Sequence, residues 1–182
     1  MKHEPTNVTH VALALPVSGR DHIQGPSDAR ITLLEYGDYE CPYCGAAYPV
    51  VKAVQKHLGA KLLFAFRNFP LINSHPHAER AAEAAEAAGT QGRFWEMHDL
   101  LYENQQALED EDIAGYAARL KLDSRRLIDE VSAGAYTARV REDFRMGARA
   151  GVNGTPTFYI NGQQYGGMPT VEGLLEALIE RP

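Results

Sequence analysis

The most informative stretch of this chain is residues 35–44, which read Glu35-Tyr36-Gly37-Asp38-Tyr39-Glu40-Cys41-Pro42-Tyr43-Cys44. It holds both cysteines of the 182-residue chain, separated only by a proline and a tyrosine. A disulfide across so short a loop would stabilise the fold by roughly 2 kcal/mol, less than half the effect of closing a ~100-residue loop. We therefore expect a dithiol that exchanges disulfides and not a structural cross-link.

This stretch connects a predicted strand to a predicted helix. Residues 31–36 form a short, β-rich apolar run in which Glu35 is the single acid. Residues 42–58 carry apolar side chains at helical spacing, and Pro42 occupies the first helical position, where proline is tolerated. Pro49 predicts a kink further along this helix. The first cysteine is therefore expected at the start of the helix, and the second one turn inside it.

The rest of the chain predicts an α/β fold with an inserted helical bundle. Alanine and glutamate dominate residues 78–88, where the alanines form one stripe and the glutamates lie elsewhere, which indicates a close-packing helix. The Asn161-Gly162 pair predicts a hairpin. The other predicted strands cover residues 6–15, 61–66, 156–160 and 163–165, and the other predicted helices cover 94–103, 111–120, 124–131, 136–150 and 171–179.

The composition argues against several classes of function. The 18 Lys and Arg against 24 Asp and Glu give a net charge of -6, which leaves no basic excess for binding nucleic acid. No apolar run approaches the ~20 residues that cross a bilayer, so no membrane insertion is expected. The brief apolar segment at residues 11–17 has no convincing cleavage site after it, and we therefore expect a cytoplasmic protein.

The chemistry of the cysteine pair follows from its place at the helix start. A free thiol with a pKa near ~8.5 is only about 3% ionised at pH 7, and only the thiolate attacks a disulfide. The unpaired N–H groups and the positive end of the helix dipole lie beside Cys41 and lower its pKa. Cys44 is expected to be more buried and less ionised. This asymmetry predicts that Cys41 attacks the substrate and that Cys44 resolves the mixed disulfide.

Metal binding is the competing interpretation. Cys41, Cys44 and His57 have the spacing of the first three ligands of a zinc finger, but no histidine follows at the required distance, so no metal site is predicted. Two cysteines also suit Cu(I), and this alternative stays open. Three other histidines are expected to be solvated residues of a loop or a helix start, namely His75, His77 and His98.

Two segments together resemble a known family. Residues 35–44 and the later stretch Val152-Asn153-Gly154-Thr155-Pro156-Thr157-Phe158 are similar to the thioredoxin superfamily, and within it to the DsbA-like thiol-disulfide oxidoreductases. The resemblance covers most of the chain and implies an α/β thioredoxin fold with an inserted all-helical domain. The expected boundaries place the thioredoxin-fold domain at residues 1–74 and 151–182, and the helical insertion at residues 75–150.

The resemblance also implies roles for single residues. Pro156 is expected to follow a cis peptide bond and to face the dithiol, while Thr155 presents backbone groups to an extended substrate. Pro42 and Tyr43 are expected to contact the substrate as well. Glu35 matches the buried acid of the family.

Glu35 allows two interpretations. It is either an acid whose charge is satisfied at a strand end, or a desolvated acid with a raised pKa that relays the Cys44 proton through water. We prefer the second, because the residue lies in an apolar strand that leads to the dithiol.

The predicted function is an enzyme that exchanges disulfides with protein thiols or with small thiols such as glutathione, without an added cofactor. The alternative is a non-catalytic module of the same fold that binds a peptide or Cu(I). The Pro42-Tyr43 dipeptide is shared with glutaredoxins, so both directions of electron flow stay open.

Overall fold

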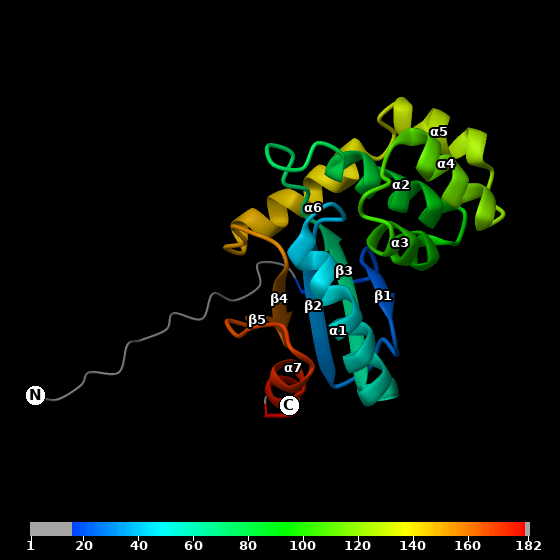
Figure 1. Cartoon of the computed structure of the whole chain (residues 1–182). Coiled ribbons are helices and arrows are strands. Elements are labelled where there is room, and N and C mark those ends of the chain that lie inside the picture. The colour runs from blue at the N-terminus through cyan, green and yellow to red at the C-terminus, as the bar shows by residue number, and fades with distance from the viewer. Residues whose placement is uncertain (1–15, 181–182) are drawn as a thin grey trace, which may run out of the picture.

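The computed structural model describes residues 16–180, and the predicted strand at residues 6–15 lies outside this range. Within it, a mixed sheet has the strand order β1-β3-β2-β4-β5 (Figure 1). The strands are β1 (His22–Gln24), β2 (Ile31–Gly37), β3 (Leu62–Asn68), β4 (Thr157–Ile160) and β5 (Gln163–Gln164).

The centre of the sheet is a strand-helix-strand unit. Helix α1 (Pro42–Leu58) follows β2 and leads through a short 3-10 turn, η1 (Gly59–Lys61), to β3, which runs parallel to β2. The helix runs through Pro49 without interruption. Strand β4 returns antiparallel to β2 on its other side, with Phe158 opposite Glu35. This arrangement places the start of α1 at the end of the central strand.

A block of helices separates β3 from β4 in the sequence. It comprises α2 (Ala78–Thr90), α3 (Phe94–Glu103), α4 (Asp110–Arg119), α5 (Ser124–Ser132) and α6 (Thr137–Arg149). In Figure 1, α2 to α5 lie together beside one end of the sheet, and α6 runs back toward β4. After the β4-β5 hairpin, α7 (Val171–Glu180) packs against α1. Among the helices of residues 16–180, none has the length and apolar character of a membrane span.

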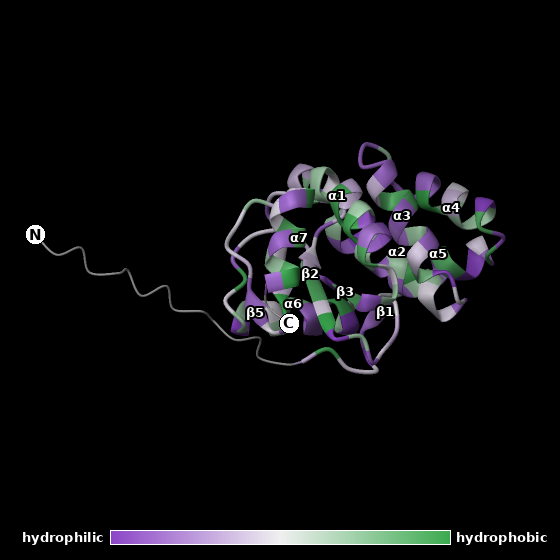
Figure 2. Cartoon of the chain, turned by 90° about the horizontal axis from the view of Figure 1, so that it is seen from below, coloured by the Kyte–Doolittle hydropathy of each residue, from purple (hydrophilic) through white to green (hydrophobic). Residues whose placement is uncertain are grey.

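The two faces of the sheet enter different apolar clusters because side chains alternate along each strand. Leu33 on β2 belongs to the larger cluster, which includes side chains of α1 and α7. Leu34 and Tyr36 belong to a smaller cluster on the opposite face. Figure 2 shows β2 as mainly hydrophobic, with helices around it whose turns alternate between the two colours. Each fully buried leucine contributes about 1.5–3 kcal/mol through this burial.

Helix α2 is more deeply enclosed than its alanine stripe predicts. Its alanines are buried, and Glu83 and Glu86 are only 6% exposed each. Glu86 accepts a hydrogen bond from the Asn68 side chain at 2.8 Å and contacts His22 at 2.9 Å. The glutamates are buried because α3, α4, α5 and α6 all pack around this helix. Polar partners offset the cost of burying these acids, from the sheet for Glu86 and from Thr137 on α6 for Glu83.

Candidate active site

Cys41 caps the N-terminus of α1. Its backbone is extended (φ -72°, ψ 121°), and Pro42 follows as the first helical residue. The Cys41 carbonyl accepts a hydrogen bond from the N–H of Gly45 at 3.0 Å, which begins the helical pattern. Cys41 is 3% exposed and Cys44 is 0% exposed. Both are free thiols, so the structure is that of the reduced dithiol.

The surroundings of Cys41 favour its thiolate and lower its pKa to about 5. The largest cause is the hydrogen bond from the Cys44 side chain, followed by hydrogen bonds from the Thr155 side chain and from the backbone N–H groups of Cys44 and Tyr43. Burial of the sulfur acts in the opposite direction. At pH 7 a thiol with such a pKa is roughly 99% ionised.

Cys44 shifts in the opposite direction. Burial raises its pKa well above the usual value, and the hydrogen bond to Cys41 and the negative charges of Glu35 and Cys41 raise it further. The two sulfurs of one helical turn therefore differ in charge, with the reactive anion on Cys41 and the retained proton on Cys44.

Glu35 lies on β2, on the sheet face that carries α1, and is 2% exposed. Its Oε1 atom has no hydrogen-bond partner within residues 16–180. Burial raises the pKa of Glu35 to about 8, and the negative charge of Cys41 adds to the shift. An acid satisfied at a strand end would have partners for both oxygens. Glu35 is therefore a desolvated acid with a raised pKa, as the second interpretation expected.

The segment before β4 also lies against the dithiol. The Thr155-Pro156 peptide bond is cis. In the thiol form, Cys41 Sγ donates to the Thr155 carbonyl at 3.4 Å. Pro42 and Tyr43 lie at the surface, where Tyr43 is 73% exposed. The structure thus brings Thr155 to the reactive sulfur and leaves the two residues between the cysteines open to a partner.

Asp38 organises the turn that precedes Cys41, a role that its place in the sequence does not reveal. It is 1% exposed. Its carboxylate accepts hydrogen bonds from the backbone N–H groups of Glu40 and Leu71, each at 2.8 Å, and contacts His75 Nδ1 at 2.8 Å. The turn is therefore fastened to the loop that follows β3.

Gln105, in the loop after α3, is a second residue that the sequence does not indicate. Its side-chain N–H donates to the carbonyls of Tyr39 at 2.9 Å and Cys41 at 2.8 Å. A Cβ atom on Gly45 would lie 2.0 Å from Gln105 Oε1. Glycine at this helical position therefore leaves the room that the glutamine needs.

A sequence model of the family described as Thioredoxin matches residues 17–180. This chain belongs to the thioredoxin family. The match covers almost all of the residues that the structure describes, including the dithiol and the insertion.

Solved structures show the same thioredoxin fold with a helical insertion. BdbD from Bacillus subtilis superposes with a TM-score of 0.81 at 22% identity, over 88% of this chain and 92% of that one. A thioredoxin-like oxidoreductase from Silicibacter pomeroyi superposes with a TM-score of 0.79 at 24% identity, over 90% of this chain and 92% of that one. Wolbachia pipientis alpha-DsbA1 superposes with a TM-score of 0.77 at 18% identity, over 92% of this chain and 93% of that one. These similarities confirm the predicted fold, an α/β thioredoxin fold of the DsbA-like kind.

Curated relatives with higher sequence identity to this chain are named as Na(+)/H(+) antiporters and not as oxidoreductases. A Na(+)/H(+) antiporter NhaA 1 of Salinispora arenicola is 44% identical over 169 residues, which are 92% of this chain and 26% of that protein. An antiporter NhaA of Herminiimonas arsenicoxydans is 41% identical over 160 residues, 86% of this chain and 25% of that protein. The chain spans about a quarter of the length of these relatives.

The prediction of solvated histidines is wrong for His98, which is buried, whereas His75 and His77 lie partly exposed in the loop before α2, each beside a carboxylate. His98 is 4% exposed and lies 3.0 Å from the Tyr39 hydroxyl through Nδ1, and burial lowers its pKa well below the usual value. His75 contacts Asp38, and His77 contacts Glu40 at 2.8 Å. Aromatic packing around α3 buries His98.

Within residues 16–180 no three His, Cys, Asp or Glu side chains form a group that could hold a metal.

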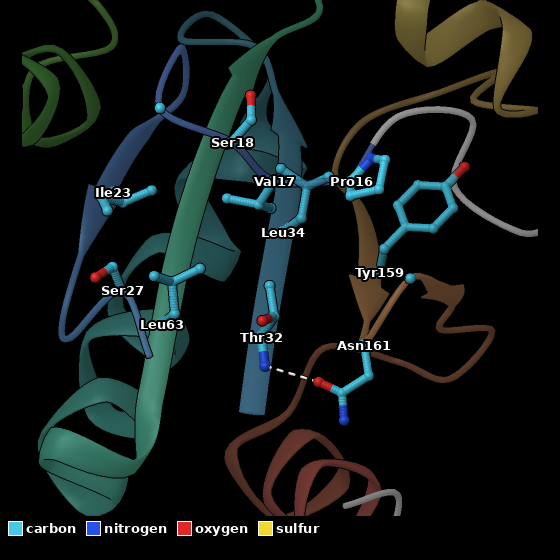
Figure 3. Close-up of a pocket in the computed structure, with 12 residues that line it drawn as sticks. Pro16, Val17, Ser18, Ile23, Ser27, Thr32, Leu34, Leu63, Tyr159 and Asn161 are labelled. Atoms are coloured by element: carbon cyan, nitrogen blue, oxygen red, sulfur yellow. Dashed lines mark hydrogen bonds between the residues drawn. The ribbon is translucent and has the colours of Figure 1, made fainter. Parts of the chain in front are cut away.

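A pocket of about 480 Å³ lies on the face of the sheet opposite α1 (Figure 3). Leu34 and Leu63 from the central strands and Tyr159 from β4 form part of its wall, and Val17 lines it as well. Asn161 Oδ1 accepts from the Thr32 N–H at 2.8 Å beside it. The described residues that line the pocket include no cysteine, histidine or carboxylate. The reactive chemistry therefore lies on the other face of the sheet.

Proposed function

We propose that this chain catalyses thiol-disulfide exchange through Cys41 and Cys44. The observation that carries the proposal is the opposite protonation of two thiols in one helical turn, because the pKa of Cys41 is lowered to about 5 while burial raises that of Cys44. An inert cysteine pair needs no such difference. Exchange requires it, since one sulfur must be a thiolate while the other keeps its proton until the mixed disulfide has formed.

In the first step the Cys41 thiolate attacks one sulfur of a substrate disulfide. A bond forms between Cys41 Sγ and that sulfur, and the second substrate sulfur leaves as a thiolate, which takes a proton from solvent. Extended substrate backbone is held along the Thr155 segment, which lies 3.4 Å from the reactive sulfur and leads into β4.

In the second step Cys44 loses its proton and attacks Cys41 Sγ. The intramolecular disulfide forms, and the first substrate sulfur leaves reduced. Glu35 in its carboxylate form accepts the Cys44 proton. The Cys41 charge that helps to raise the pKa of Glu35 disappears in the mixed disulfide, so the pKa of Glu35 falls at the stage where a base is needed. The reverse sequence oxidises a substrate dithiol.

Catalytic reduction of insulin disulfides in dithiothreitol tests the proposal. Cys41→Ser is expected to abolish turnover, and Cys44→Ser is expected to accumulate mixed disulfides through Cys41. Glu35→Gln is expected to slow the second step and leave the first unchanged. A wild-type chain that does not accelerate the reduction above the rate with dithiothreitol alone would refute the proposed function.

The second candidate is a module that binds a peptide or Cu(I) without turnover. The observation that favours it is a pair of free cysteines in one helical turn, which offers two soft sulfur ligands. Tight stoichiometric binding of Cu(I) together with absence of insulin reduction would support this candidate. Turnover that is insensitive to a Cu(I) chelator would exclude it as the main function.

The substrate class proposed is protein thiols, with glutathione as the small-thiol alternative, and the compartment proposed is the cytoplasm. The curated relatives add a membrane transport protein to the partners worth testing, because related segments occur within proteins named antiporters. Mixed disulfides captured on Cys44→Ser and identified by mass spectrometry distinguish these partners. Cell fractionation followed by immunoblotting tests the compartment.

A further inference from the structure

Apart from the Thr155 hydroxyl, which interacts with Cys41, two buried oxygen atoms near the dithiol have no hydrogen-bond partner among the described residues. They are the hydroxyl of Tyr102 and Oε1 of Glu35. Tyr102 is 6% exposed and Glu35 is 2% exposed. A buried polar group without a partner costs about 1–3 kcal/mol, so two such groups at one site point to a shared partner or a function.

Gly37 shows where the Tyr102 hydroxyl lies. A Cβ atom built on Gly37 would come within 2.6 Å of it. Gly37 and Glu35 are two residues apart on β2, so their Cβ directions point to the same face, roughly 6–7 Å apart along the strand. The hydroxyl therefore stands over β2 on the face that carries Glu35. The missing side chain of Gly37 makes room for it.

The ring of Tyr102 is held in place by its neighbours. Its centroid lies 4.9 Å from the rings of Tyr39 and His98 and 5.5 Å from that of Tyr48. Tyr102 belongs to α3, so the insertion delivers this hydroxyl to the sheet. A fixed ring gives the hydroxyl a defined position.

The electrostatic surroundings keep this hydroxyl neutral. Burial raises the pKa of Tyr102 well above its usual value, and the negative charges of Cys44 and Glu35 are the next largest causes, ahead of Tyr39 and Asp38. A neutral hydroxyl can accept one hydrogen bond while it donates another. Cys44 and Glu35 are also coupled to each other, since the charge of Glu35 raises the pKa of Cys44.

We propose that the Tyr102 hydroxyl, together with one buried water, connects the Cys44 thiol to the Glu35 carboxyl and conducts the proton between them. This inference rests on the proposed function and deepens it. The Cys44 thiol gives up one proton to this chain of hydrogen bonds, the hydroxyl and the water each release one proton as they accept one, and the Glu35 carboxylate takes up one proton. Tyr102 itself ends each cycle unchanged, so it is a positioning residue that acts through the water.

Tyr102→Phe is the direct test, because it removes only the hydroxyl and keeps the ring. The rate to measure is the collapse of a preformed mixed disulfide on Cys41, followed in single turnover across a range of pH. We expect this rate to fall about tenfold. This is less than the 10²–10⁴-fold that a proton-transfer group itself contributes, because Glu35 and the water remain in the variant. In a Cys44→Ser background, the rate of the first attack by Cys41 is expected to be the same with and without the hydroxyl.

Tyr159→Phe is the matched control. Tyr159 is 0% exposed and its hydroxyl donates to the Ala150 carbonyl at 2.8 Å, on the opposite face of the sheet. This variant also loses a buried hydroxyl, but its collapse rate is expected to equal that of the wild type. Glu35→Gln combined with Tyr102→Phe is expected to be no slower than Glu35→Gln alone, because two members of one relay are not additive.

The infrared carbonyl stretch of protonated Glu35, assigned by its loss in Glu35→Gln, gives an independent readout. It is expected to shift in Tyr102→Phe and not in Tyr159→Phe. An unchanged collapse rate, or a slower rate with the wild-type pH profile and an unshifted band, would overturn the relay while the wild-type activity still stands. A wild-type chain without exchange activity would instead refute the proposed function, and the relay with it.

Discussion

The side-chain amide of Gln105 donates a hydrogen bond to the carbonyl of Cys41 at 2.8 Å. The same nitrogen donates to the Tyr39 carbonyl at 2.9 Å, so one side chain of the insertion holds both sides of the turn that enters α1. The N–H groups of Tyr43 and Cys44 stabilise the Cys41 thiolate only while that turn directs them at the sulfur. The helical insertion therefore contributes to the low pKa of Cys41.

Gln105→Leu is predicted to raise the pKa of Cys41 by about one unit, because a loosened turn weakens hydrogen bonds worth about 0.5–1.5 kcal/mol each. Thiolate absorbance measured against pH reports this change. Gln91→Leu is the matched control, since its amide also bridges the backbone, at Asp123, within the insertion. A Cys41 pKa that is equal in both variants would show that Gln105 has no part in thiolate stabilisation.

The acidity of Cys41 also predicts how stability depends on pH. Its pKa in the folded, reduced protein is lowered from 9.0 to about 5, so the thiolate stabilises the fold above about pH 9 and this contribution is lost as the pH falls toward 5. The disulfide form has no such group. In a Glu35→Gln background, the free energy of unfolding of the reduced form minus that of the oxidised form is expected to rise with pH by up to about 1.4 kcal/mol per unit. Urea unfolding of both forms measures it, and a difference independent of pH contradicts the assignment.

Glu35 is predicted to act with the opposite sign. Its pKa is raised from 4.5 to about 8, so the protonated acid favours the fold below about pH 4.5, and this contribution is lost as the pH rises toward 8. The reduced wild type is therefore expected to lose stability relative to Glu35→Gln across this window. Paired urea titrations at each pH give the comparison. Parallel curves for the two proteins would mean that Glu35 ionises as an ordinary surface acid.

A buried ion pair between Arg67 and Asp21 gives a prediction that concerns the stability of the fold and not the activity of the dithiol. Arg67 donates to both oxygens of Asp21 at 2.7 and 2.9 Å, and both side chains are 0% exposed. Asp21→Ala is expected to cost about 3–5 kcal/mol in the free energy of unfolding, because it leaves a buried charge without its counterion. Glu96→Ala, which breaks the exposed pair with Arg93, is expected to cost under about 1 kcal/mol. Equal midpoints of urea unfolding for the two variants would contradict this ranking.

Local patterns were sufficient for most of the helices and strands, although the short edge strand β1 at His22–Gln24 was not predicted. The helix over Pro42–Leu58 and the hairpin at Asn161 and Gly162 are both present, with positive φ at both hairpin residues. They are predictable because helix starts and tight turns depend on backbone contacts between residues only a few positions apart. The direction of the cysteine asymmetry was predictable from the helix start, because the Cys44 side chain and the N–H groups of Cys44 and Tyr43 all favour the Cys41 thiolate. Its extent also depends on tertiary contacts, since burial is the largest cause of the raised pKa of Cys44.

The partners of the site depended on the tertiary structure. Gln105 reaches Cys41 across 64 positions of sequence, and Tyr39 reaches His98 across 59. No periodicity or spacing reports such pairs, because they arise when the packing of α2 and α3 brings distant segments together and removes water from both. A glutamine or histidine that looks like a solvated side chain in the sequence becomes a partly or fully buried hydrogen-bonding group once its neighbours exclude water. The local sequence therefore predicted which sulfur has the lower pKa, whereas burial and long-range contacts decided how far the two pKa values separate and which residues surround the dithiol.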